Sequence, residues 1–140
     1  MHNDIEFQAL ATAEHVREIA ALFIRMSEAI HHALRELAGS NSENSSSAYA
    51  LLTEEYALRS RANMLMIEAN RFAHPGLGIT QQEMVDTLEA IYVKLKSACE
   101  LNELSEIIIG VVLFANSIVS TKNTIIYFLL NELKSTLQSD

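Results

Sequence analysis

The chain has 140 residues, 49% of them hydrophobic and 20% charged, which is the composition of one globular domain and not of a disordered chain. Its formal net charge of −8 makes free nucleic acid a poor partner, because binding needs several cationic side chains that face phosphates. Cys99 is the single cysteine and the N-terminus lacks the apolar core of a secretory signal, so we expect a cytoplasmic protein.

Long amphipathic helices are the pattern that dominates the sequence. One proline and four glycines leave few breaks, and apolar residues recur every three or four positions. We therefore predict an all-α fold, an antiparallel bundle of four long helices over about 4–38, 48–74, 80–100 and 103–137. The whole chain, 1–140, forms one helical domain, with a flexible serine-rich loop at 39–47.

The helix predicted over 4–38 contains one pair with metal-ligand spacing. Glu28 and His31 have the Glu-x-x-His spacing of di-iron helical bundles. Such a centre takes about six ligands, including a second pair of this kind, and the chain has none. We interpret His31 as a flank histidine beside a surface glutamate, and we predict no metal and no cofactor.

His32 lies opposite the apolar stripe of the same helix, so we expect its side chain to be exposed. The stretch HALRE, His32 to Glu36, resembles the His-x-x-Lys-Gly pattern of histidine phosphotransfer domains, which are helical bundles. Arg35 stands at the lysine position, and Glu36 departs from the small residue of that family. The resemblance implies a phosphoacceptor role for His32, and a phosphotransfer-type signalling bundle is our first alternative function.

Polar residues also line the non-core side of the helix predicted over 48–74. Glu55 and Arg59 form an i, i+4 pair in the favourable order. We interpret this polar seam either as a half-exposed flank or as a groove for a partner or a small ligand. A ligand-binding or metal-binding helical bundle is therefore the second alternative function. The seam consists of Glu55, Tyr56, Arg59, Asn63 and Asn70.

Thr80 and Glu83 form a capping box that predicts the start of the helix over 80–100. In the last helix, predicted over 103–137, Lys122 is the only charge between Glu106 and Glu132. We expect this lysine to have a structural role, with its stem reaching solvent or its ammonium group paired with a carboxylate such as Glu54.

The side of this last helix away from its core face is polar but uncharged, whereas an ordinary solvent-exposed face carries Lys and Glu. We assign Ile125 to the core face and expect the uncharged side to be covered by another protein. The longest apolar run, IIIGVVLFA, has nine residues against about 20 needed to cross a bilayer, so we expect no membrane span. The predicted interaction residues are Asn116, Ser120, Asn123, Tyr127 and Asn131.

These observations predict a non-enzymatic protein–protein interaction module, such as a small acidic adaptor, a chaperone-like protein, an immunity factor or a regulator. The sequence contains no phosphate-binding loop, no Cys-x-x-Cys pair and no dinucleotide fingerprint. We expect the partner to be a second copy of the chain, giving a homodimer, with a basic protein as a further partner.

Overall fold

The computed structural model describes residues 7–40 and 45–138. No described residue belongs to a β-strand, and a single isolated bridge joins Gln8 to Thr80. The predicted all-α class is therefore confirmed. The helices of the described residues are α1 (Ala13–Ser40), α2 (Ser45–Ile67), α3 (Ala69–Phe72), α4 (Gln81–Ser97), α5 (Leu101–Ser120) and α6 (Asn123–Gln138).

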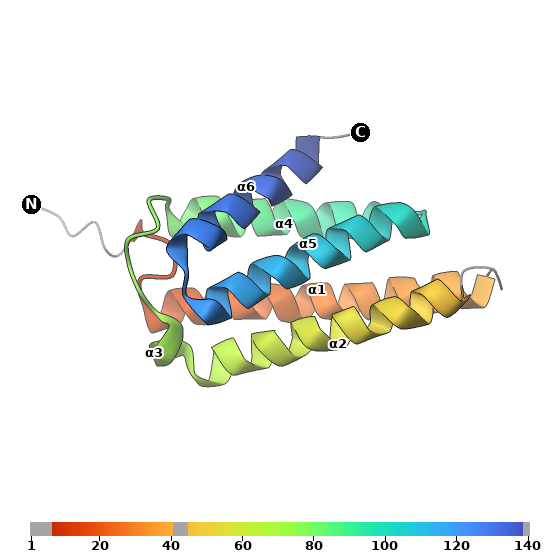
Figure 1. The fold of residues 1–140 in the computed structure, drawn as a ribbon, viewed down its shortest axis with the longest axis horizontal. Helices are drawn as coiled ribbons and strands as arrows, with labels where there is room; N and C mark the ends of the chain where they lie inside the picture. The colour runs from red at the N-terminus through yellow and green to blue at the C-terminus, as the bar shows by residue number, and fades with distance from the viewer. Residues whose placement is uncertain (1–6, 41–44, 139–140) are drawn as a thin grey trace, which may run out of the picture.

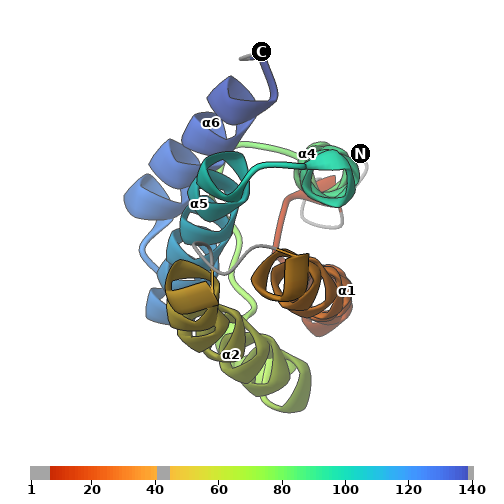
Figure 2. The same ribbon diagram turned by 90° about the vertical axis from the view of Figure 1, so that its right-hand side faces the viewer.

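The helices form two hairpins that lie side by side (Figure 1). In one hairpin α1 packs against α2, and in the other a short loop joins α4 to α5. α1 also contacts α4 and α2 contacts α5, and in both of these pairs the helices run in the same direction (Figures 1 and 2). α6 returns across α5 and α4. The predicted antiparallel bundle of four helices is therefore not confirmed.

The core lies between α1, α2, α4 and α5, and it follows the apolar periodicity of the sequence. Phe23 on α1 and Phe114 on α5 meet at its centre, with ring centroids 6.1 Å apart in an edge-to-face arrangement. The stripe along α1 is fully buried at Val16, Ile19, Phe23, Met26, Ile30 and Leu34.

The first helix begins at Ala13, and the predicted start at Asp4 is wrong; residues 4–6 themselves lie outside the described residues. Residues 7–12 run instead beside the segment that leads into α4. The backbone N–H of Ala9 donates to the carbonyl of Ile79 at 3.0 Å, and Leu10 occupies the left-handed region with φ 61°. Hydrogen bonds to a distant segment replace those of a first helical turn.

The predicted boundaries around the second helix also change. α1 continues through Ser40 and α2 begins at Ser45, so most of the predicted loop 39–47 is helical; residues 41–44 lie outside the described part of the chain. α2 ends at Ile67, and the separate turn of α3 follows, where one helix was predicted to His74. Glu68, with φ −110° and ψ 39°, is the residue at the break.

The capping box at the start of α4 is present in part. The hydroxyl of Thr80 accepts a hydrogen bond from the backbone N–H of Glu83 at 3.0 Å, as the sequence predicts. The carboxylate of Glu83 forms an ion pair with Lys134 of α6. This pair connects α6 to α4.

The predicted last helix is two helices, because the chain turns at Thr121. That residue has left-handed backbone angles, φ 53° and ψ 38°, and its N–H donates to the carbonyl of Ile118 at 3.0 Å. His74 Nε2 lies 2.6 Å from Oδ1 of Asn123, the first residue of α6. Lys122 is exposed in the turn itself. The single continuous face predicted over 103–137 is therefore wrong.

Replacement of Thr121 by glycine is expected to raise the free energy of unfolding by about 1 kcal/mol, because a β-branched residue is strained in the left-handed region where glycine is not. Chemical denaturation followed by circular dichroism measures the change. A decrease in stability would mean that the hydroxyl contact to the carbonyl of Ser120, at 2.7 Å, outweighs the backbone strain.

α5 is, among the described helices, the one long and apolar enough to cross a membrane by length and composition alone. Half of its most apolar window is buried inside the protein. A helix at the centre of a bundle meets the same criterion, so the expected absence of a membrane span stays a prediction.

Candidate functional site

The polar seam predicted on α2 divides into a buried part and an exposed part. Glu55 is 5% exposed, and its carboxylate accepts a hydrogen bond from Nε of Arg59 at 3.1 Å. Tyr56 and Asn63 are exposed on α2, and Asn70 is exposed on the separate short helix α3. The five residues therefore do not form one groove, although the predicted pair of Glu55 and Arg59 is present.

The second partner of Glu55 is His31, whose Nδ1 lies 2.9 Å from the carboxylate. The interpretation of His31 as the neighbour of surface residue Glu28 missed this contact across the helix pair. A buried carboxylate shared by two cationic or donor groups holds α1 against α2. The described residues contain no group of three or more His, Cys, Asp or Glu side chains that could hold a metal ion.

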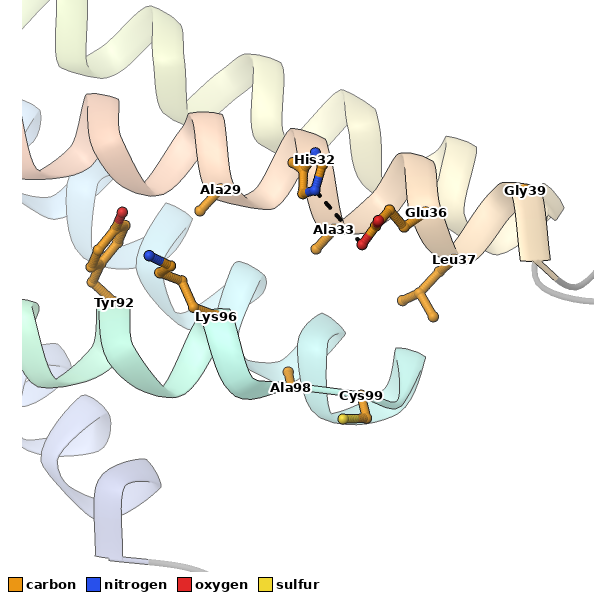
Figure 3. A pocket seen from close by; sticks show the side chains of 10 residues that line it. All are labelled: Ala29, His32, Ala33, Glu36, Leu37, Gly39, Tyr92, Lys96, Ala98 and Cys99. Atoms are coloured by element: carbon orange, nitrogen blue, oxygen red, sulfur yellow. Dashed lines mark ion pairs between the residues drawn. The ribbon is translucent and has the colours of Figure 1, made fainter.

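His32 lies at the rim of a groove between the C-terminal ends of α1 and α4, with a volume of about 860 Å³ (Figure 3). The imidazole is 78% exposed, as the helix periodicity predicts, and its Nε2 lies 3.7 Å from Glu36. An acidic neighbour repels an incoming phosphoryl group, so this geometry adds no support for a phosphoacceptor. The lining residues are Ala29, His32, Ala33, Glu36, Leu37, Gly39, Tyr92, Lys96, Ala98 and Cys99.

The positive charges near this groove are already engaged. The guanidinium carbon of Arg25 on α1 lies 4.6 Å from the ring centroid of Tyr92, and Lys96 Nζ lies 5.2 Å from the same ring. The contact of Arg25 joins α1 to α4, whereas that of Lys96 lies within α4. Ala29, Ala33 and Ala98 also line the groove, and their side chains offer a ligand no directional binding.

The interaction residues predicted on the last helix are separated by the turn at Thr121. Asn116 Oδ1 accepts a hydrogen bond from Nε of Arg61 on α2 at 2.9 Å, and Asn123 lies against His74. Ser120, Tyr127 and Asn131 are exposed. Two of the five residues thus make contacts within the chain, and the set does not share a face.

Large apolar side chains are also exposed on α5 and α6. Ile109 and Leu113 on α5 are 46% and 47% exposed, and Ile125 and Phe128 on α6 are 44% and 59% exposed. The assignment of Ile125 to the core face is therefore wrong. The sequence signal for this surface is the absence of charge between Glu106 and Lys122. The sequence places Leu113 and Phe128 on this uncharged side among the polar residues, but we chose only polar residues as the interaction residues.

One row of residues along α5 follows a regular spacing. Starting at Asn102, its members lie alternately four and three residues apart, which places them in one stripe along the helix. All of them are exposed except Asn116, which is half-buried, and Glu103 is exposed beside the stripe. Asn116 borders α2 through Arg61, and Gly110 borders α6, where a Cβ would lie 3.2 Å from Cδ2 of Leu133. We define the α5 seam as Asn102, Glu106, Ile109, Leu113, Asn116 and Ser120.

The α5 seam has the spacing that one helix uses to pack against another, and its core-facing counterpart on α5 is already used within the protein. Ile107, Ile108 and Val111 are buried, so the seam is a second packing face on the same helix.

Comparisons of the chain with protein-family models, with curated proteins and with solved structures find no match.

Proposed function

We propose that the protein is a non-enzymatic association module, and that the α5 seam, together with Ile125 and Phe128 of α6, is its docking surface. The observation that carries the proposal is the exposure of large apolar side chains in a stretch whose only charge between Glu106 and Glu132 is Lys122. On this surface, two large apolar side chains of α5 and two of α6 remain in contact with water.

Energetics favour association at this surface. Full burial of an isoleucine, leucine or phenylalanine side chain is worth about 1.5–3 kcal/mol, and the four side chains here are each about half exposed. Docking that covers them recovers several kcal/mol in total. The α5 seam has one charged member, Glu106, so a partner displaces water there at little electrostatic cost.

A second copy of the chain is the partner that we propose. With a formal net charge of −8, two copies repel each other over most of their surfaces. The uncharged surface around Leu113 is where two copies approach with least repulsion. No comparable observation supports the alternative function, phosphotransfer by His32 at the rim of the groove.

Replacement of Leu113 by glutamate is expected to convert a dimer into a monomer of 15.6 kDa, because it places a charge at the centre of the surface. Light scattering at several concentrations measures the mass. Val93→Glu is the matched control: Val93 is 66% exposed on α4, away from the seam, and its variant should keep the wild-type mass.

Both variants change exposed positions, so their thermal unfolding should match that of the wild type at low protein concentration. A wild-type protein that stays monomeric at every concentration contradicts the proposed self-association. If Leu113→Glu has the same mass as the wild-type dimer, the proposal that α5 forms the docking surface is wrong.

A further inference from the structure

The α5 seam has the same pattern of polarity read from either end. Asn102 and Glu106 are polar, Ile109 and Leu113 are apolar, and the last two residues, Asn116 and Ser120, are polar again. A two-fold axis perpendicular to the helix places such a pattern on a reversed copy of itself. The seam is therefore self-complementary in the antiparallel direction.

We propose that two copies dock through α5 in an antiparallel arrangement, centred between Ile109 and Leu113. This inference rests on the proposed function, self-association, and adds the direction and the register. Ile109 of each copy then packs beside Leu113 of the other, and the apolar residues form the centre of the contact. Ser120 lies beside Asn102 of the second copy at each end.

The polar residues between the apolar centre and the two ends of the seam also meet suitable partners in this arrangement. Glu106 of one copy lies beside Asn116 of the other in this register. Because Oδ1 of Asn116 accepts from Arg61, its amide Nδ2–H is the side of the group suited to donate to a carboxylate. Arg61 adds a positive charge next to that layer.

Charge along α5 favours the antiparallel direction for a second reason. The N-terminal end of the helix carries Glu100 and Glu106, whereas Arg61 and Lys122 lie at its C-terminal end. Antiparallel docking brings each acidic end to a basic end, and the two helix dipoles oppose each other favourably. Parallel docking in the same seam would place Glu106 against Glu106 of the second copy.

Cysteine cross-linking tests the arrangement, with Cys99→Ser as the background. Two single-cysteine proteins are made, Asn102→Cys and Ser120→Cys, both at exposed positions. Within one copy these positions lie about 27 Å apart along the helix at 1.5 Å per residue. Each protein is oxidised alone and as an equal mixture by dissolved oxygen with a copper catalyst, and disulfide-linked dimers are counted on a non-reducing gel.

The expected result is a disulfide-linked dimer in the mixture, with at least a ten-fold lower yield from either protein alone. Ala90→Cys, exposed on α4, is the control and should not cross-link to Ser120→Cys. Efficient cross-linking of each protein with itself overturns the antiparallel direction in favour of a parallel one.

Failure of the inference and failure of the proposed function are separable. If no pair cross-links while the wild type remains a dimer that Leu113→Glu dissociates, the surface is right and the register is wrong. If the wild type is a monomer in light scattering, both the proposed self-association and its register are overturned.

Discussion

Replacement of Phe114 by alanine is expected to lower the free energy of unfolding by about 3–5 kcal/mol. Phe114 is fully buried on α5, and its ring makes an edge-to-face contact with Phe23 from α1 at a centroid distance of 6.1 Å. The truncation removes apolar contacts and leaves a cavity where the two hairpins meet. Urea denaturation followed by circular dichroism, with an unchanged slope, measures the loss.

Phe7→Ala is the matched control, because Phe7 is 63% exposed and loses little burial; we expect a change below about 1 kcal/mol. A double-mutant cycle with Phe23→Leu should show coupling between the two rings of about 0.5–1.5 kcal/mol. A loss below about 1 kcal/mol for Phe114→Ala would contradict the central position of this ring in the core.

The core could be predicted from the sequence wherever one helix has one apolar side. The stripe of α1 from Val16 to Leu34 follows the 3.6-residue period and is buried throughout. α2 was harder, because its apolar residues surround the helix and mark no single buried direction. Its polar members, Glu55 and Tyr56, are neighbours in sequence, yet the structure buries the first and exposes the second.

The turn at Thr121 could not be predicted, because no glycine or proline marks it. A threonine in left-handed geometry is stabilised by distant contacts: His74 lies against Asn123, and Lys134 of α6 pairs with Glu83 of α4. These contacts, which offset the backbone strain at Thr121, come from segments about 50 residues away in the sequence. The local periodicity of the sequence therefore gives no sign of them. The missed break then misplaced Ile125.

The docking surface was predictable in location but not in composition. The absence of charge between Glu106 and Lys122 marks the part of the chain where Ile109 and Leu113 are exposed, which is the surface that we propose for docking. Treating 103–137 as one helix, however, joined Asn116 to Asn123 and Tyr127 as one polar face. Once α5 is a separate helix, the stripe that remains exposed is centred on Ile109 and Leu113.

Replacement of Glu55 by alanine is expected to lower the free energy of unfolding by about 1–3 kcal/mol. Removal of one partner of a fully buried ion pair costs about 3–5 kcal/mol, and the lower value here reflects the partial exposure of His31 and Arg59. The carboxylate lies 2.9 Å from His31 Nδ1 and 3.1 Å from Arg59 Nε, so its loss leaves both groups without this acceptor. Chemical denaturation measures the change.

Glu28→Ala is the control that separates the sequence interpretation from the structure. The Glu-x-x-His spacing assigned His31 to Glu28, an exposed residue, whereas the structure pairs His31 with Glu55 on the neighbouring helix. We expect Glu28→Ala to change stability by less than about 0.5 kcal/mol. In double-mutant cycles with His31→Ala, coupling should appear with Glu55 and be absent with Glu28. Coupling with Glu28 instead would mean that the imidazole turns outward and that α1 and α2 are held together by apolar packing alone.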